Sequence, residues 1–322
     1  MNKKIFVTRM IPDIGIDMLR DKGYQVDINT KDKILTKKEL ISSLRKDDYY
    51  AVLSLLTDKI DSSIFDIAPS VKLYANYATG FDNIDIAEAK KRGIAVTNAP
   101  SELSSRSVAE HTMSLAFALS RRIVEANDFT RKGKYVGWSP MNFIGSDIFG
   151  KTIGLIGAGY IGERVAFYAK AMGLKVIYYD IVKNNRLYTE YGGKYFDSID
   201  EVLKQSDIVS LHVPLLESTH HLINEKRLKM MKPTSYLINT SRGPIVDEKA
   251  LVNALKNKTI AGAGLDVFEF EPKLSTGLKN LSNVILTPHI ASASFEARND
   301  MARIAVENII SFIETGKVKN SV

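Results

Sequence analysis

The sequence predicts an α/β protein with two domains, each built on a doubly wound parallel sheet. The chain has 322 residues, enough for about two domains of roughly 100–200 residues each. Short apolar runs alternate with amphipathic stretches, and this alternation occurs twice along the chain. A break at residues 98–100 and a long apolar segment after it separate the two series. Together these observations predict two α/β domains.

The first series fills the first hundred residues. Strands are expected at short apolar runs, and helices where apolar residues recur at helical spacing. Gly23, Pro69 and Gly93 end three of the expected helices. The expected strands are 4–8, 24–28, 51–56, 71–77 and 94–97, and the expected helices are 14–22, 37–46, 62–68 and 84–91.

The segment after the break is rich in small and apolar residues from Ser104 to about Arg131. We expect one buried helix here that links the domains. Residues 133–150, which include Trp138, are expected to form an arm without regular structure. Loops of this length are commonly functional or interacting segments.

The second series resumes the alternation of strands and helices. Its last helix carries an apolar face that includes Met301, Ala305 and Ile309, and we expect it to return to the first domain. The expected strands are 152–156, 175–179, 208–213, 235–240, 260–267 and 284–286, and the expected helices are 161–172, 199–205, 248–257 and 297–314.

Composition excludes several classes of protein. The chain has no Cys, which removes disulfides, thiolate metal sites and a cysteine nucleophile. Its net charge of +7 comes from scattered Lys and Arg, which does not favour nucleic acid. No run approaches the ~18 apolar residues of a membrane helix or the core of a signal peptide. We expect a soluble, cytoplasmic protein with no metal site and no membrane or nucleic-acid partner.

The strongest local motif is a glycine-rich loop after the strand predicted at 152–156. Gly157 suits a tight turn, Gly159 lets a pyrophosphate approach the backbone, and Gly162 lets helix and strand pack closely. The helix that follows offers free N–H groups and a positive dipole end to phosphates. The motif predicts a dinucleotide-binding site.

An acidic residue ends the next strand. Asp180 follows Gly162 by 18 residues and is expected to accept hydrogen bonds from the adenosine ribose. Its charge would repel a 2′-phosphate, so NAD(H) is favoured. Lys183 and Arg186 lie just beyond it and could bind a 2′-phosphate, so NADP(H) remains possible.

Three later segments place polar residues directly after apolar strands. They are LINTSRGPIVDE (237–248), GAGLDVFEFEP (262–272) and VILTPHIASAS (284–294). In a doubly wound sheet these strand ends form the ligand crevice, so Arg242, Asp266, Glu271 and His289 could converge there.

With these segments, the chain resembles the D-isomer-specific 2-hydroxyacid dehydrogenase family, most closely its glyoxylate/hydroxypyruvate reductase branch. Further matching pieces are LLTDKID (55–61), YATGFDNIDI (77–86), RGIAVTN (92–98), VGWSP (136–140) and SLHVPL (210–215). The resemblance implies NAD(P)H-dependent reduction of a small 2-oxo acid, glyoxylate or hydroxypyruvate, to the D-2-hydroxy acid, and the reverse oxidation.

The resemblance also implies a role for each matching residue. His289 would be the acid/base, Glu271 would hold its other ring nitrogen, and Arg242 would pair with the substrate carboxylate. Leu55, Thr79, Gly80 and Trp138 would complete the substrate site with Arg242 and His289. The implied cofactor-binding residues are Val108, Gly157, Gly159, Tyr160, Ile161, Gly162, Asp180, His212, Val213, Pro214, Thr219, Thr240, Ser241, Arg242, Asp266, His289, Ala291 and Ser292.

The resemblance finally implies a domain plan and an assembly. Residues 1–99 and 290–322 would form a flavodoxin-like substrate domain, and residues 100–289 would form a Rossmann cofactor domain. Two copies of the chain would form a homodimer.

Two histidine predictions come from the residues alone: His111 is packed or at a subunit contact, while His220 and His221 form a solvated pair.

Alternatives remain open at this point. One is a D-lactate-type or phosphoglycerate-type dehydrogenase. The other is a non-catalytic NADH-sensing interaction protein.

Overall fold

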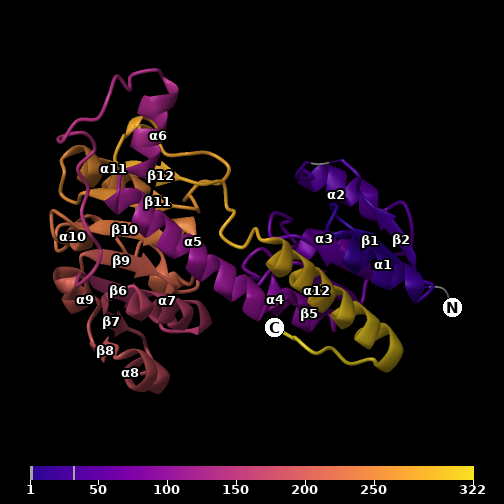
Figure 1. Cartoon of the computed structure of the whole chain (residues 1–322). Coiled ribbons are helices and arrows are strands. Elements are labelled where there is room, and N and C mark those ends of the chain that lie inside the picture. The colour runs from indigo at the N-terminus through magenta and orange to yellow at the C-terminus, as the bar shows by residue number, and fades with distance from the viewer. Residues whose placement is uncertain (1–2, 32) are drawn as a thin grey trace. The chain divides into compact units, whose positions relative to one another are not determined.

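The computed structural model describes residues 3–31 and 33–322, which fold into two compact units (Figure 1). One unit holds the chain up to Ser104 together with Ala293–Val322, and the other holds Ser105–Ser292. Within the described residues, the first unit contains a five-stranded sheet and the second a seven-stranded sheet. The paired strands of both sheets run parallel. The predicted class, two parallel-sheet α/β domains, is confirmed.

The first sheet has the strand order β2-β1-β3-β4-β5, which is the flavodoxin-like order. Helices join successive strands, as parallel pairing requires. The strands are β1 (Lys4–Val7), β2 (Gln25–Ile28), β3 (Ala51–Ser54), β4 (Leu73–Asn76) and β5 (Ala95–Thr97). The helices are α1 (Asp13–Asp21), α2 (Lys37–Leu44), α3 (Ser62–Ile67), α4 (Ile86–Lys91) and α12 (Phe295–Thr315).

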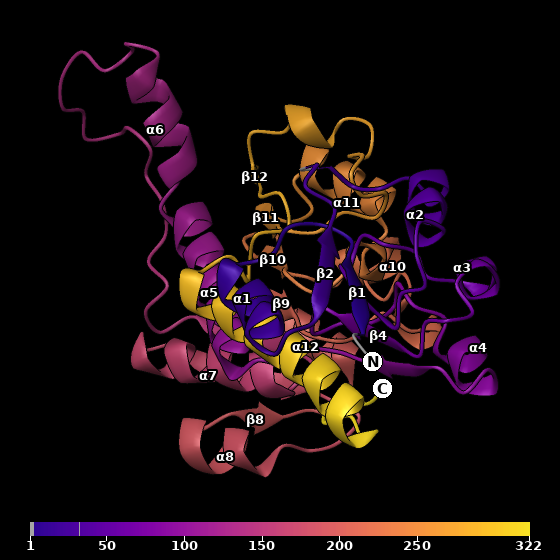
Figure 2. The ribbon, with the colours of Figure 1, turned by 90° about the vertical axis from the view of Figure 1, so that its right-hand side faces the viewer.

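The last helix packs in this first unit. Figure 2 shows α12 alongside α1. The two helices approach most closely where Gly15 of α1 packs against Ala302 of α12. A Cβ on Gly15 would lie 3.1 Å from the Cβ of Ala302, so the missing side chain allows this close approach. Met301 and Ala305 join Ile5 in one hydrophobic cluster, so apolar residues almost 300 positions apart in the chain share a core.

The second sheet has the order β12-β11-β10-β9-β6-β7-β8, with the chain reversing direction across the sheet between β6 and β9. Its strands are β6 (Thr152–Ile156), β7 (Lys175–Tyr179), β8 (Lys194–Tyr195), β9 (Ile208–Leu211), β10 (Tyr236–Asn239), β11 (Gly262–Leu265) and β12 (Val284–Leu286). Its helices are α5 (Glu102–Ser120), α6 (Ile123–Arg131), α7 (Tyr160–Ala171), α8 (Asn185–Tyr191), α9 (Ile199–Gln205), α10 (Glu225–Leu228) and α11 (Glu248–Lys256).

Helices cover both faces of this second sheet. Residues of α5 and α7 form one hydrophobic cluster with the strands, and residues of α9, α10 and α11 form another. Because both faces are buried, the strands are continuously apolar rather than alternating. This explains why short apolar runs were sufficient to predict them.

The single buried helix predicted from Ser104 to about Arg131 is wrong over its last part. The helix is interrupted at Arg122, whose φ of 54° lies in the left-handed region. The helix that follows, α6, has no buried residue. Arg121 and Arg122 are adjacent on the chain, and burying both charged groups would be costly. Arg122 instead pairs with Glu125, 2.6 Å from Nη2 to Oε2.

Three short elements were not predicted: α8, β8 and α10. They are brief and polar, so they carry little hydrophobic periodicity.

Among the described residues, no helix has both the length and the apolar character needed to cross a membrane. Over the same residues, no three His, Asp or Glu side chains are grouped as metal ligands.

Candidate active site

Most of the predicted cofactor-site residues follow strands of the second sheet. Because parallel strands end at the same edge, the residues that follow them lie along one edge, where ligands bind in such sheets. These residues are Gly157 after β6, Asp180 after β7, His212 after β9, Thr240 after β10, Asp266 after β11 and His289 after β12.

The glycine loop has the geometry that a bound pyrophosphate needs. Gly157 has a φ of +101°, and a Cβ there would lie 2.5 Å from the backbone oxygen of His212. A Cβ on Gly162 would lie 2.3 Å from the backbone oxygen of Gly157. Gly159 is different, because nothing stands within 4 Å of its missing Cβ. Two glycines are therefore required by packing, and the third leaves open space where a phosphate can approach.

Asp180 is fixed beside this loop. Its Oδ2 accepts a hydrogen bond from the N–H of Ala158 at 2.6 Å, and its Oδ1 accepts one from the N–H of Val182 at 3.3 Å. The side chain is half-buried, so part of the carboxylate still faces solvent. This placement fits a carboxylate that binds the ribose of a dinucleotide on the loop.

The segment after β9 forms a closed turn. Burial lowers the pKa of His212 to about 3, so this ring is neutral at neutral pH, and it bonds to the Ser210 hydroxyl at 2.9 Å. Thr219 donates from Oγ1 to the carbonyl of Pro214 at 2.6 Å. It also accepts from the N–H of Leu216 at 2.8 Å. Thr219 thus holds together the turn that carries Val213 and Pro214, two of the predicted cofactor-binding residues.

His289 and Glu271 form a hydrogen-bonded pair, 3.1 Å from Nδ1 to Oε2. The other carboxylate oxygen of Glu271 accepts from the N–H of Phe268 at 2.9 Å. Burial alone would raise the pKa of Glu271. The bond and charge of His289, the Phe268 N–H and the charge of Arg242 outweigh it and hold that pKa below the usual range of a glutamate. Glu271 is therefore ionised at neutral pH.

The backbone of His289 is strained, and Asp266 holds it. His289 has a φ of +56°, which is unusual for a residue with a side chain. Its N–H donates to the carbonyl of Asp266 at 2.9 Å. The buried carboxylate of Asp266 accepts from the N–H groups of Ile290 at 2.9 Å and Ala291 at 2.7 Å. The side chain of Asp266, one of the implied cofactor-binding residues, therefore also shapes the turn that presents His289.

Two residues near Asp266 were missed as site residues. Thr287 donates from Oγ1 to Asp266 Oδ1 at 2.6 Å, and His111 Nε2 lies 3.1 Å from the same hydroxyl. His111 therefore packs within the second unit, against the turn of His289. Next to it on α5, Thr112 bonds to the hydroxyl of Thr240 at 3.0 Å. The only sequence signal was a polar pair inside an apolar helix.

Arg242 lies in a turn that packs directly on the segment carrying Glu271. A Cβ on Gly243 would come within 1.9 Å of the Phe268 backbone, so only glycine allows this contact. Asn239 donates from Nδ2 to the carbonyl of Arg242 at 2.9 Å. The contact explains why the charge of Arg242 acts on the pKa of Glu271.

Glu248 and Glu269 each accept a hydrogen bond from the other's backbone N–H, which holds the segment that carries Glu271. Glu248, 1% exposed, accepts from the N–H of Glu269 at 2.7 Å and from the N–H of Ser275 at 3.3 Å. Glu269 accepts from the N–H of Glu248 at 3.0 Å and pairs with His221 Nε2 at 2.7 Å. His221 is therefore half-buried and hydrogen-bonded to Glu269, which corrects the prediction of a solvated pair; His220 is exposed as expected.

The other predicted substrate residues do not join this cluster within the second unit. Leu55, Thr79 and Gly80 belong to the first unit. Asn98 donates from Nδ2 to the carbonyl of Thr79 at 2.7 Å, and Asn76 donates from Nδ2 to the carbonyl of Gly80 at 2.9 Å. Among the described residues, the backbone N–H groups of Thr79 and Gly80 donate no hydrogen bond. These two N–H groups are thus available to an anion.

The remaining predicted cofactor residues differ in exposure. Val108 and Ala291 are buried, Tyr160 is 86% exposed, and Ile161, Val213, Ser241 and Ser292 are half-buried. Trp138 lies in the arm after α6 and is 84% exposed.

A parallel sheet with a glycine loop after an inner strand, an acid after the next strand and a His–Glu pair at the same edge defines a nicotinamide dinucleotide-dependent dehydrogenase. The comparisons specify which family. Residues 113–291 match the NAD binding domain of the D-isomer specific 2-hydroxyacid dehydrogenases. The chain belongs to this family, and the resemblance is confirmed.

Similar proteins cover nearly the whole chain. A glyoxylate reductase from Thermococcus litoralis is 46% identical over 316 residues, which are 97% of this chain and 94% of that protein. A structure of an NADPH-dependent glyoxylate/hydroxypyruvate reductase from Sinorhizobium meliloti, with NADP and malonate, has a TM-score of 0.86. It is 31% identical and covers 100% of this chain and 97% of that one. A glyoxylate reductase from Paecilomyes thermophila has a TM-score of 0.87 at 32% identity, covering 100% and 98%.

Proposed function

We propose that this protein reduces glyoxylate or hydroxypyruvate with NADH, giving the D-2-hydroxy acid, and catalyses the reverse oxidation. The observation that carries the proposal is the His289–Glu271 pair beside Arg242, at the edge of the sheet that bears the glycine loop. The similar proteins described as glyoxylate reductases support the choice of substrate.

The bound cofactor supplies the hydride. The chain supplies the proton and the charge. Since Nδ1 of His289 is held by Glu271, Nε2 is the nitrogen that donates a proton to the substrate's carbonyl oxygen. Arg242 pairs with the substrate carboxylate, because its planar fork fits two carboxylate oxygens. In the oxidation the same histidine takes the proton back.

The proposal of NADH rests on Asp180. A carboxylate bonded to the glycine loop favours ribose hydroxyls and repels a 2′-phosphate. The second unit is accordingly assigned to the cofactor and the first to the substrate, whose anion would be bound by the N–H groups of Thr79 and Gly80.

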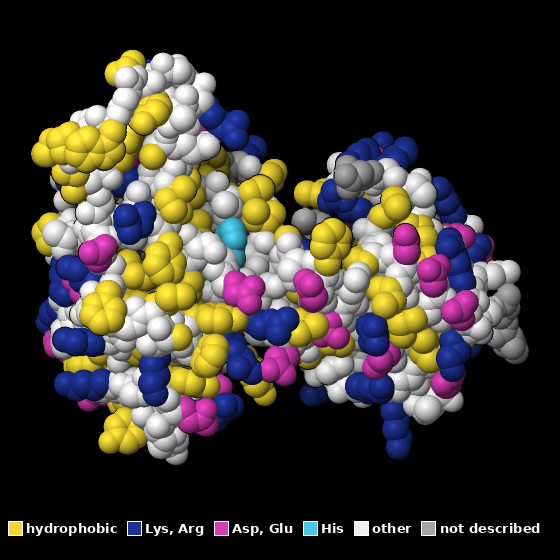
Figure 3. Space-filling model, in the orientation of Figure 1, with side chains coloured by type: hydrophobic (Ala, Val, Ile, Leu, Met, Phe, Trp, Pro, Cys, Tyr) yellow, Lys and Arg dark blue, Asp and Glu magenta, His cyan; other side chains and the backbone are white. Residues whose placement is uncertain are grey.

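We further propose a cytoplasmic homodimer in which a second copy covers α6 and the arm. Figure 3 shows hydrophobic side chains gathered over this part of the second unit. They include Tyr135, 58% exposed, Val136, 98%, Trp138, 84%, and Met141, 74%. Apolar side chains exposed together in this way are typical of an interface. Light scattering at micromolar concentration tests the dimer, and the mass of a monomer alone would refute it.

A substrate screen tests the function. NADH oxidation is followed with glyoxylate, hydroxypyruvate, pyruvate and 3-phosphohydroxypyruvate, with His289→Gln as the control. We expect the highest kcat/KM with glyoxylate or hydroxypyruvate, and at least a thousandfold loss in the variant. A preference for pyruvate would support a D-lactate-type enzyme. No turnover of any of the four would refute the proposal.

A further inference from the structure

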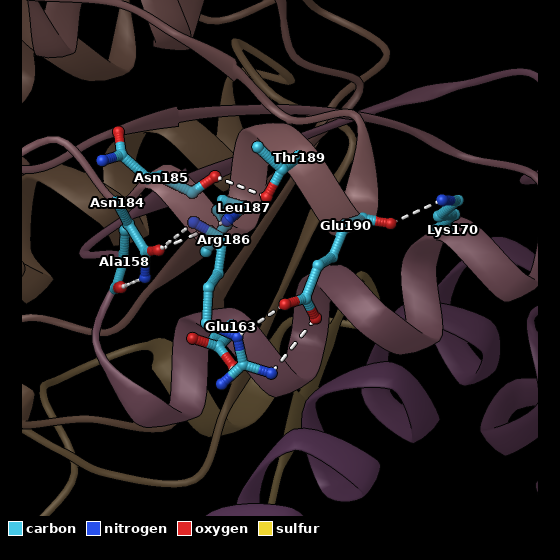
Figure 4. A network of polar contacts seen from close by, with 9 residues as sticks. All are labelled: Ala158, Glu163, Lys170, Asn184, Asn185, Arg186, Leu187, Thr189 and Glu190. Atoms are coloured by element: carbon cyan, nitrogen blue, oxygen red, sulfur yellow. Dashed lines mark hydrogen bonds and ion pairs between the residues drawn. The ribbon is translucent and has the colours of Figure 1, made fainter.

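Arg186, at the start of α8, is held between two carboxylates (Figure 4). Its Nε and Nη2 bind the two oxygens of Glu190 at 2.9 and 3.1 Å, a two-point contact within one helical turn. Its Nη1 lies 2.9 Å from Oε1 of Glu163 on α7. The bond to Glu190 and the charge of Glu163 raise the pKa of Arg186. All its guanidinium nitrogens thus face carboxylates.

This ion-paired arginine lies next to the cofactor loop. Asn184 donates from Nδ2 to the carbonyl of Ala158 at 2.7 Å, and its Oδ1 accepts from the N–H of Arg186 at 3.0 Å. Asp180 binds the N–H of the same Ala158. The ribose-binding carboxylate and the start of α8 are therefore joined to one residue of the glycine loop. A free Arg186 side chain would be a candidate ligand for a 2′-phosphate there.

Glu163 and Glu190 hold the arginine in different ways. The Glu163 side chain is only 12% exposed, and a carboxylate so nearly buried requires a positive partner. Glu190 lies four residues after Arg186, the spacing at which helical side chains meet. Lys170 donates to the backbone carbonyl of Glu190 at 2.6 Å, which ties the end of α8 to α7. Releasing Arg186 would thus break contacts on both helices.

We propose that Glu163 and Glu190 are specificity-determining residues, which exclude NADPH by keeping Arg186 from the 2′-phosphate. This inference rests on the proposed dinucleotide site and extends it. A 2′-phosphate must compete with two carboxylates already bound to Arg186, and it also meets their negative charge in addition to that of Asp180. Preference for NADH is then set by three acidic residues rather than by Asp180 alone.

The test measures binding of nucleotide fragments without turnover. Calorimetry with the full chain compares 2′,5′-ADP and 5′-ADP on the wild type and on E163Q/E190Q. Glutamine keeps the size of each side chain but removes its charge. We expect the Kd for 2′,5′-ADP to fall at least tenfold, while the Kd for 5′-ADP changes less than twofold. The ratio of kcat/KM for NADPH over NADH should rise in parallel.

Three further variants make the result specific. Adding Arg186→Gln to the double variant should abolish the gain, because the freed guanidinium is its source. Glu190→Gln alone should give a smaller gain in affinity for 2′,5′-ADP. Because Glu190 is exposed, this variant should fold even if loss of Glu163 unfolds α7, so the proposal can still be tested. Glu225→Gln removes a carboxylate from a similar pair with Lys229 on α10 and should change neither Kd.

Two results would overturn the inference. One is an unchanged Kd for 2′,5′-ADP in folded E163Q/E190Q. The other is a gain that survives loss of Arg186, since the cause would then be the removed charge alone. Failure of the wild type to bind 5′-ADP would instead refute the dinucleotide site, and with it the proposed function.

Discussion

Replacing Glu271 by Gln tests whether the His289–Glu271 pair handles the proton. Reduction needs a protonated His289, because the new alkoxide must receive a proton, and oxidation needs the neutral ring. Reduction should therefore fall as pH rises and the ring loses its proton. The negative charge 3.1 Å from Nδ1 favours the protonated ring. In Glu271→Gln the falling limb of the reduction profile should move to lower pH.

The structure limits the size of this movement. Both side chains are about one-third exposed, 29% for His289 and 33% for Glu271, so solvent screens the pair and an attraction of about 1 kcal/mol remains. At a fixed pH on the falling limb, Glu271→Gln should therefore reduce glyoxylate about fivefold more slowly than the wild type. The lowered pKa of Glu271 keeps its charge beside His289 until the pH falls below the usual range of a glutamate, so the pair should stay intact across the neutral and alkaline pH values of the assay.

The assay is the pH profile of kcat/KM for glyoxylate in the wild type and Glu271→Gln. Glu269→Gln is the matched control, because Glu269 pairs with His221 in the same segment and does not bond to His289. Its alkaline limb should stay in place. If the limb of Glu271→Gln coincides with that of the wild type, the assignment of the pair is wrong. Equal movement in both variants would indicate a displaced segment rather than a lost charge.

Three other substitutions have defined outcomes. Asp180→Ala should weaken the binding of NADH, because a charge-assisted hydrogen bond to the ribose of about 1.5–3 kcal/mol is lost. The NADH/NADPH ratio of kcat/KM should then fall roughly tenfold, and an unchanged ratio would mean that Asp180 does not face the ribose. Arg242→Lys keeps the charge but loses the two-point fork, so kcat/KM for glyoxylate should fall about a hundredfold with the Kd for NADH unchanged; wild-type turnover would exclude Arg242 as the carboxylate ligand. Glu248→Gln replaces one acceptor of a backbone N–H, so it should lower the melting temperature and, like Glu269→Gln, leave the alkaline limb in place. A moved limb would show that Glu248 also positions Glu271.

Much of the fold follows from local sequence. Strands buried on both faces are continuously apolar, and helices between them repeat apolar residues at helical spacing, so most elements were predicted within a few residues. The errors arise where this signal is weak or tertiary contacts decide. The helix α8 is short and polar, and the break at Arg122 depends on which face of the helix is buried.

The sequence by itself determined the cofactor loop and the nature of the site residues. The spacing of Gly157, Gly159 and Gly162 after a strand is sufficient, because the turn and the helix start are local structures. The prediction that His289 is the proton donor likewise rests on its position in a segment that resembles the family.

Only the tertiary structure decided what these groups contact. Arg186 was a candidate phosphate ligand in the sequence, but a carboxylate from another helix binds it. Asp266 was expected to contact the cofactor, yet its oxygens accept N–H groups about 25 residues further along. His111 meets Thr287 across 176 residues. The physical reason is common to all three: hydrogen bonds and ion pairs depend on distances across the folded chain, and spacing along the sequence does not encode those distances.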